Sequence, residues 1–393
     1  MSIAPVAAVR NVRPWGNDAV DLVIDDDMIS AIRPASDAPV RPGEIDGRGM
    51  LALPGLVNTH AHVDKSWWGL PWQSYGGEGG TDGRIRHERA RRDELGIPSV
   101  GITAAVLAEF VRHGTTAVRT HVDVDLGLGL RGIEVVREAF AAYDGALAYE
   151  IVAFPQDGVL RRPGVMELLA NAAAAGVEHI GGLDPAGIDR DPVGQLDGLF
   201  AIAAEHGCGL DIHLHDGDEL GLFQFDLILD RVERLGLIGT VNIAHGFAIG
   251  SAAPSRRRDL LQRMAGLGVT MTTVAPLGLP QLKLSEFDAE GVRFGLGTDG
   301  IRDLWSPYGT GDLLETARQY SRASGLVRDE DLTRVVRIAT SASMPFVGRA
   351  AMDIAVGARA DIVILDAENP MDALVRAPER AHTIAGGRSV FSR

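Results

Sequence analysis

Two pairs of histidines with the pattern His-x-His are the residues of this sequence best suited to chemistry. His60 and His62 lie in the stretch LPGLVNTHAHVDK, and His213 and His215 lie in DIHLHDGDE. In an extended strand, side chains two residues apart point to the same side, so each pair presents two imidazoles together. Two such imidazoles are a natural pair of metal ligands. One His-x-His also occurs in ordinary packed strands, but the second pair makes a metal site the stronger interpretation.

Two further residues extend this candidate site. His245 ends the short apolar run in VNIAHG, and Asp299 follows the run in GLGTDG. A carboxylate at such a strand end can bind a metal and can also accept the proton of a coordinated water. The sequence therefore predicts that histidines and one aspartate from four separate strands hold one divalent metal ion. We expect Zn²⁺, with Fe²⁺ as the alternative.

The elements that must position these residues form a regular series. From about residue 54 to residue 345, short β-branched runs alternate with Ala-, Leu- and Arg-rich stretches, which is typical of a parallel sheet with helical crossovers. The predicted strands are residues 55–60, 116–122, 146–153, 179–183, 209–215, 241–245, 269–274 and 292–297. Eight strands in one series predict a (β/α)₈ TIM barrel, in which the carboxyl ends of all strands meet on one face.

Both ends of the chain have a different residue pattern. Residues 3–53 contain short alternating apolar stretches, and the C-terminal stretch ADIVILDAENPMDALVRAPERAHTIAGGRSVFSR also indicates small strands. We therefore expect an α/β protein in which segments 1–54 and 346–393 form one small β-sandwich domain and segment 55–345 forms the barrel. The insertion 66–97, which is rich in tryptophan and glycine, is a candidate lid over the active face or a surface loop pinned by aromatic packing.

The bulk composition narrows the choice of partners. The chain has 393 residues and a formal net charge of -15, and no basic stripe suits nucleic acid or an anionic membrane. Because neither an export leader nor an apolar span of membrane length is recognisable, the cytoplasm is the expected compartment. The single cysteine, Cys208, excludes an internal disulfide and the His/Cys/Cys zinc site of the small nucleobase deaminases. We expect a small-molecule partner, and the sequence leaves open whether the protein forms a homo-oligomer.

At these residues the chain resembles the amidohydrolase superfamily, in its cytosine deaminase-like branch, over nearly its whole length. The resemblance implies a metal held by His60, His62, His213 and Asp299. It also implies that His245 stabilises the group under attack. The separation of His213 from His245 matches that of the family without a gap, which favours His213 over His215 as the ligand from the fifth strand.

Other matching segments concern the substrate. The segment AFPQDG resembles the family segment whose glutamine reads a ring amide, which here is Gln156. Within the branch, the chain looks closest to triazine hydrolases of the N-isopropylammelide isopropylaminohydrolase type. That likeness implies catalytic roles for Lys65 and for His215 as the acid/base, and a role at the substrate for Asp184 on the fourth strand. We expect Trp305 to hold the face of the ring.

Several residues have a second interpretation. Asp216 stands where cytosine deaminase has a glutamate that shuttles protons, so either His215 or Asp216 is the main shuttle. Gly300 replaces an aspartate that would touch the substrate in the relatives, which predicts a changed substrate. His121 fits a packed residue behind the ligands better than a ligand. Three residues also have a purely structural interpretation. Lys65 suits an ion pair, Asp184 suits a turn, and Gln156 suits a hydrogen bond to the backbone.

These features predict a hydrolase of carbon–nitrogen bonds other than peptide bonds, of the deaminase kind that acts on cyclic amidines. We expect a metal-activated water to displace ammonia or an alkylamine from a small N-heterocycle of the pyrimidine or triazine type. One alternative is a cyclic amidase of the hydantoinase or dihydroorotase type, which usually bridges two metals with a carboxylated lysine on strand 4. That strand has Asp184 and no lysine here. The other alternative is a non-catalytic barrel that binds a small molecule.

Overall fold

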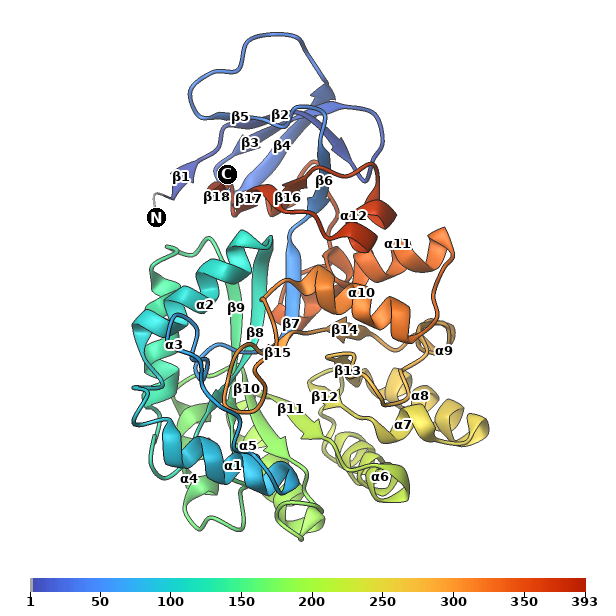
Figure 1. Ribbon diagram of the computed structural model, residues 1–393. Helices are drawn as coiled ribbons and strands as arrows, with labels where there is room; N and C mark the ends of the chain where they lie inside the picture. Colours follow the sequence, from blue (N-terminus) through green and yellow to red (C-terminus); the bar gives the residue numbers. More distant parts are fainter. Residues whose placement is uncertain (1–2) are drawn as a thin grey trace.

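The computed structural model describes residues 3–393, and a barrel of parallel strands forms its centre (Figure 1). In hydrogen-bonded order the strands are β7 (Leu56–His62), β8 (Thr115–Asp123), β9 (Ala148–Phe154), β10 (His179–Leu183), β11 (Gly209–Leu214), β12 (Val241–His245), β13 (Thr270–Thr273) and β14 (Phe294–Leu296). The short strand β15 (Asp299–Gly300) follows β14 and pairs with β7, which closes the ring. All eight predicted strands are confirmed, although several begin or end at neighbouring residues.

The barrel strands are buried over much of their length because both of their faces are covered. Every residue of β7, LVNTHAH, and of β8, TTAVRTHVD, is buried. Such near-continuous burial is typical of parallel strands that lie between an inner core and an outer layer of helices. Buried polar side chains in these strands therefore need a hydrogen-bond partner or a ligand.

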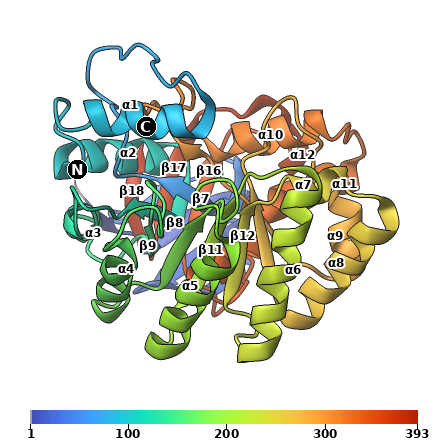
Figure 2. The ribbon, with the colours of Figure 1, turned by 90° about the horizontal axis from the view of Figure 1, so that it is seen from below.

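The helices lie outside the strands (Figure 2). Around the barrel they are α2 (Val100–Arg112), α3 (Arg131–Ala141), α4 (Val165–Ala174), α5 (Pro192–His206), α6 (Asp218–Leu235), α7 (Ala248–Ser251), α8 (Pro254–Leu267), α9 (Leu284–Glu290), α10 (Leu313–Ala323), α11 (Asp329–Ile338) and the 3₁₀ helix η1 (Ser341–Val347). The side chains of Ser99 and Asp191 cap the first turns of α2 and α5, and Gly207 ends α5 in the left-handed conformation. No helix within residues 3–393 is both long and apolar enough to cross a lipid bilayer.

Both chain ends build the small β domain, as predicted (Figure 1). Its strands are β1 (Ala4–Pro5), β2 (Ala8–Pro14), β3 (Val20–Asp25), β4 (Met28–Pro34), β5 (Glu44–Asp46), β6 (Leu51–Pro54), β16 (Ile362–Leu365), β17 (Arg380–Ala385) and β18 (Arg388–Ser392), with α12 (Pro370–Arg376) between β16 and β17. They form one hydrogen-bonded path, β1-β18-β17-β16-β6-β2-β3-β4, from which β5 branches at β2. Apolar side chains from its two halves, such as Leu22 and Ile362, pack into one separate core.

Candidate metal centre and active site

The predicted metal ligands come together where β7 and β11 end and β15 begins. Nε2 of His62 lies 3.4 Å from Nε2 of His213 and 3.4 Å from Oδ1 of Asp299. Nε2 of His60 lies 3.7 Å from the same Asp299 oxygen. The candidate ligand atoms of His60, His62 and His213 all lie within 4.8 Å of one another. Side chains that are distant in sequence therefore meet at one point on the active face of the barrel.

These separations fit four donor atoms around a single ion that keeps a further position open for water. Metal–ligand bonds of about 2.0–2.1 Å place neighbouring ligand atoms of a four- or five-coordinate ion roughly 3–3.5 Å apart. The separations of 3.4 and 3.7 Å are close to that range. Nε2 of His60 is buried and has no hydrogen-bond partner among residues 3–393, and a buried polar atom of this kind is costly unless a ligand satisfies it. The residues at this site therefore fit a divalent metal.

Burial and neighbouring charges give these side chains the protonation states that metal binding needs. Burial, followed by the charge of Lys65, holds the pKa of His62 well below its usual value. Burial, followed by the neighbouring histidines, has the same effect on the pKa of His213. Burial alone would raise the pKa of Asp299, but its interactions with His60 and the other histidines hold that pKa well below its usual value. At neutral pH both imidazoles are neutral and the carboxylate is ionised, as metal ligands must be.

Two more histidines contact this cluster. The ring of His245, at the end of β12, lies 4.8 Å from the ring of His60 and 4.3 Å from that of His215. The ring of His121 lies 4.2 Å from that of His60 and is fully buried, and its Nε2 is 3.8 Å from Oδ2 of Asp211 in the middle of β11. His245 lines a cavity beside the cluster, whereas His121 lies deeper in the barrel.

His215 and Asp184 form a pair beside His245. Nδ1 of His215 lies 2.8 Å from Oδ2 of Asp184. Burial would lower the pKa of His215, but the adjacent carboxylate of Asp184 raises it overall. Asp216 instead accepts hydrogen bonds from the backbone N–H of Gly187 and the side-chain amide of Gln224, both at 2.9 Å. The imidazole of His215 therefore faces the cavity, while the carboxylate of Asp216 is bound to α6 and to the loop after β10.

Lys65 and Gln156 are joined at the polar end of the cavity. Nζ of Lys65 donates to Oε1 of Gln156 at 2.6 Å and to Oδ1 of Asp123 at 3.2 Å. It also lies 5.7 Å from the centre of the Trp305 ring. Burial would lower the pKa of Lys65, but Asp123 and other nearby carboxyl groups raise it. Because the oxygen of Gln156 accepts from Lys65, the amide NH₂ of Gln156 is the group left to donate to a ligand.

Two buried carboxyl groups lie near this end of the cavity, Asp303 in its wall and Glu88 against Trp305, and neither was predicted from the sequence. Glu88 accepts a hydrogen bond from the indole N–H of Trp305, and Asp303 lies between Trp305 and the end of β15. Burial raises the pKa of Glu88 well above its usual value and raises that of Asp303 to about 6. The available sequence signals were that Glu88 is the one acidic residue in the run RIRHERARR and that Asp303 follows closely after Asp299.

The cavity beside the ligands has a volume of about 790 Å³, which lies within the usual range of small-molecule sites. Its polar wall contains His62, His213, His215, His245, Asp299, Lys65, Gln156 and Trp305, so most of the predicted site residues meet there. An apolar wall is formed by Phe247, Val274, Pro276, Leu277, Leu279 and Tyr308. Asp184, which was expected to bind substrate, contacts His215 instead of lining the cavity.

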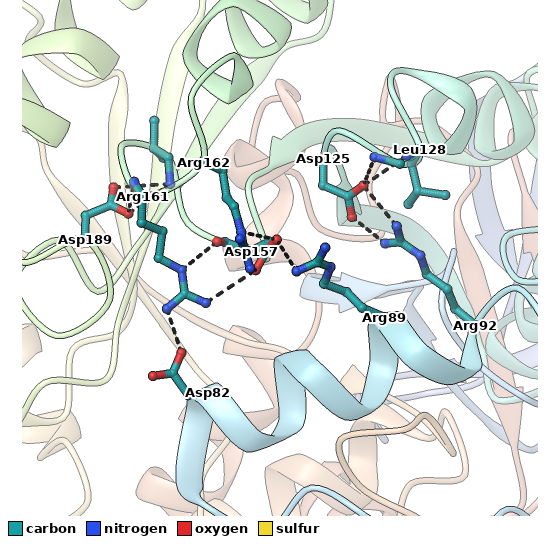
Figure 3. Close-up of polar contacts among 11 residues, drawn as sticks. Asp82, Arg89, Arg92, Asp125, Leu128, Asp157, Arg161, Arg162 and Asp189 are labelled. Carbon is teal, nitrogen blue, oxygen red and sulfur yellow. Dashed lines mark hydrogen bonds and ion pairs between the residues drawn. The ribbon is translucent and has the colours of Figure 1, made fainter.

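Helix α1 (Gly80–Arg91), within the insertion 66–97, forms part of the cavity wall through Thr81 and Arg84. Ion pairs hold this helix against the barrel (Figure 3). The buried carboxylate of Asp157 accepts from Arg89, Arg161 and Arg162. The half-exposed Asp82 pairs with Arg161, and Arg92 binds Asp125 through its two terminal guanidinium nitrogens. Ile85 is the one large apolar residue that α1 buries, so its docking depends mainly on charge.

Comparisons with known proteins found relatives in sequence and in fold. N-isopropylammelide isopropyl amidohydrolase of Pseudomonas sp. (strain ADP) is 30% identical over 97% of this chain and 96% of its own length. Pterin deaminase of Rhizobium rhizogenes is 26% identical over 91% of this chain and 84% of its own length. The crystal structure of N-isopropylammelide isopropylaminohydrolase from Burkholderia multivorans is 41% identical, with a TM-score of 0.92 over 98% of this chain and 97% of that chain.

A family model covers most of the chain as well. It is described as "Amidohydrolase family" and matches residues 98–391, which include the second to eighth barrel strands and part of the small β domain. The resemblance seen in the sequence is thereby confirmed. This chain belongs to the amidohydrolase family.

Proposed function

We propose that this protein is a metal-dependent aminohydrolase that releases ammonia or an alkylamine from a small N-heterocycle of the pyrimidine or triazine type. The observation that carries the proposal is the meeting of His62, His213 and Asp299, with separations that suit one ion, at a cavity of small-molecule size. The relatives named for N-isopropylammelide hydrolysis and for pterin deamination support this reaction class.

The metal ligands in this proposal are His60, His62, His213 and Asp299. We propose Zn²⁺ as the ion, with Fe²⁺ as the alternative. When bound, such an ion lowers the pKa of a coordinated water from about 15.7 towards 7, so that the water becomes a nucleophile at neutral pH. Asp299, which is ionised at neutral pH, would accept the proton of that water. His245 stabilises the negative charge that develops on the attacked group.

His215 is the acid that protonates the leaving nitrogen. Its ring borders the cavity, and Asp184 raises its pKa, so a protonated imidazole persists to higher pH than for an ordinary histidine. Asp184 acts through His215 by fixing the orientation of the ring. The hydrogen bonds that occupy Asp216 favour His215 as the shuttle.

Lys65, Gln156 and Trp305 hold the substrate ring. The NH₂ group of Gln156 donates to a ring acceptor, and Lys65 supplies a positive charge beside the reacting carbon as well as fixing the amide of Gln156. The Trp305 ring packs on the face of the heterocycle. The substrate is the small-molecule partner in this proposal, and the cytoplasm is the compartment that we propose for the reaction.

An amine-release screen tests this function. The zinc-loaded protein is incubated with aminopyrimidines, alkylamino-triazines, pterins and hydantoins, and released ammonia or alkylamine is quantified. We expect release from at least one pyrimidine, triazine or pterin, and loss of release after chelation of the metal. Opening of a hydantoin ring without release of an amine supports a cyclic amidase instead. Tight binding of a ring compound without turnover by the metal-loaded protein supports a non-catalytic barrel.

A further inference from the structure

The polar groups that border the cavity differ in whether they already have hydrogen-bond partners within the protein. Lys65 donates to Asp123 and Gln156, and the ring of His215 is paired with Asp184. Asp303, which is 6% exposed, is different. Its Oδ2 accepts no hydrogen bond from any residue of the described part of the chain. Because Asp303 borders the cavity, a donor to Oδ2 must come from a ligand or from solvent in that cavity.

The rest of Asp303 is held rigidly. Its Oδ1 accepts the backbone N–H groups of Trp305 at 2.8 Å and Ser306 at 2.7 Å. Its own backbone N–H donates to the Ser306 carbonyl, and its carbonyl accepts from the indole of Trp67. Because the main chain and one carboxylate oxygen are fixed, the direction of Oδ2 is fixed as well.

Gly300 is what allows this placement. A Cβ atom at residue 300 would lie 1.8 Å from Oδ2 of Asp303, far inside van der Waals contact. The backbone of Gly300 pairs with His62 in β7, so it cannot move away without disturbing the metal ligands. Any side chain at 300 would therefore displace the Asp303 carboxylate and break its bonds to Trp305 and Ser306. The carboxylate lies directly against the residue that follows Asp299.

We propose that Oδ2 of Asp303 accepts a hydrogen bond from an N–H group of the substrate ring and thereby selects heterocycles that carry a free ring N–H. This inference rests on the proposed function, because it names the chemical feature that the same site reads. An acceptor fixed in a buried wall favours an N–H and disfavours a ring nitrogen that carries an alkyl group, since the alkyl group leaves the carboxylate unpaired and collides with it.

The test compares ring compounds that differ at one nitrogen. Cytosine, ammelide and their ring-N-methylated derivatives are assayed with the zinc-loaded wild type, Asp303→Asn, Gly300→Ala and Glu315→Gln. Asp303→Asn keeps an oxygen for Trp305 and Ser306 and places a donor where Oδ2 was. Gly300→Ala keeps Asp303 but displaces its carboxylate. Glu315→Gln removes a charge from the same cavity at its exposed rim, so it is the matched control. Discrimination is read from kcat/KM where turnover occurs and from Kd by calorimetry where it does not.

For the wild type and Glu315→Gln we expect at least one unmethylated compound, the N–H parent, to be preferred over its ring-N-methylated derivative by about 10- to 100-fold. In Asp303→Asn and Gly300→Ala that preference should be lost while the zinc content stays unchanged. An undiminished preference in both variants overturns the inference, as does a wild type that binds no N–H parent. Failure of the proposed function can be distinguished from failure of this inference. In that case the protein binds the compounds and discriminates between them at the ring N–H, but it releases no amine.

Discussion

Asp184 holds His215 at two points, because its Oδ2 lies 2.8 Å from Nδ1 of the ring and its Oδ1 accepts the backbone N–H of the same residue. Asp184 follows β10 directly, and His215 follows β11, so two neighbouring parallel strands end in a bonded pair. The ring is fixed with Nε2 as the atom free to exchange a proton with a ligand. This arrangement suits a general acid held in one orientation.

Replacement of Asp184 by asparagine tests this arrangement. We expect Asp184→Asn to lower kcat by roughly 10²- to 10⁴-fold, the usual contribution of general acid–base catalysis, because an amide does not stabilise the imidazolium. The bound metal should stay at the wild-type level, as measured by elemental analysis of the same samples.

The control for that variant is Asp216→Asn. The new amide oxygen can still accept from Gly187 and Gln224, so kcat should stay close to the wild-type value. A loss in Asp216→Asn as large as that in Asp184→Asn would instead assign the shuttle to Asp216.

The ion pairs of α1 predict a lid whose opening depends on charge. Asp157→Asn weakens the bonds to Arg89, Arg161 and Arg162 in a buried setting, so amide hydrogen exchange in residues 80–91 should become about 10-fold faster or more. KM should rise, because Thr81 and Arg84 of the same helix line the cavity.

Asp82→Asn is the control for the lid. It removes a partly exposed ion pair to Arg161, and pairs near the surface are typically worth no more than about 1 kcal/mol, so exchange should change less than in Asp157→Asn. Hydrogen exchange measured by mass spectrometry separates the two variants. Equal protection of residues 80–91 in Asp157→Asn and the wild type would contradict a lid held by charge.

The contact between Asp312 and Arg380 predicts how stability depends on pH. Asp312 caps α10, and its carboxylate pairs with the fully buried guanidinium of Arg380 in the small β domain. Burial would raise the pKa of Asp312, but its hydrogen bond to His113 and the charge of Arg380 lower it below 3.8. The stabilisation from this group is therefore present above about pH 4 and is lost as the pH falls through the lower folded-state pKa.

We expect Asp312→Asn to keep the helix cap but to lower the free energy of unfolding at neutral pH by about 3 kcal/mol, because a buried charge is left without its partner. The difference from the wild type should shrink below pH 4, as followed by urea unfolding. Asp144→Asn, which removes an exposed ion pair to Arg388 between the same two domains, should change stability by no more than about 1 kcal/mol. A pH-independent difference for Asp312→Asn would contradict the assignment.

Much of this site was predictable because the barrel fold itself brings the ends of the strands together. Once eight strands are recognised, residues at their carboxyl ends must meet, so His60, His213 and Asp299 could be grouped from the sequence alone. The choice between His215 and Asp216 could not be made, because the two are adjacent and only side-chain contacts with Asp184 and Gln224 separate them.

The contributions of Glu88 and Asp303 were not predictable. Glu88 reaches Trp305 from α1, whose sequence GTDGRIRHERAR has no apolar periodicity that would indicate a helix or its buried side. The structural role of Gly300 depends on how the chain turns after β15, because this turn brings Asp303 back against Gly300. Contacts of this kind arise from loop conformation, which short-range sequence patterns do not specify.

Metal content, measured by elemental analysis after zinc loading and gel filtration, tests the central claim most directly. His213→Ala removes one imidazole from the cluster, and His206→Ala removes an exposed imidazole at the end of α5. The proposed centre predicts one firmly held ion per chain in the wild type and in His206→Ala, with little metal in His213→Ala. A full equivalent of zinc retained by His213→Ala, or none in the wild type, would contradict it.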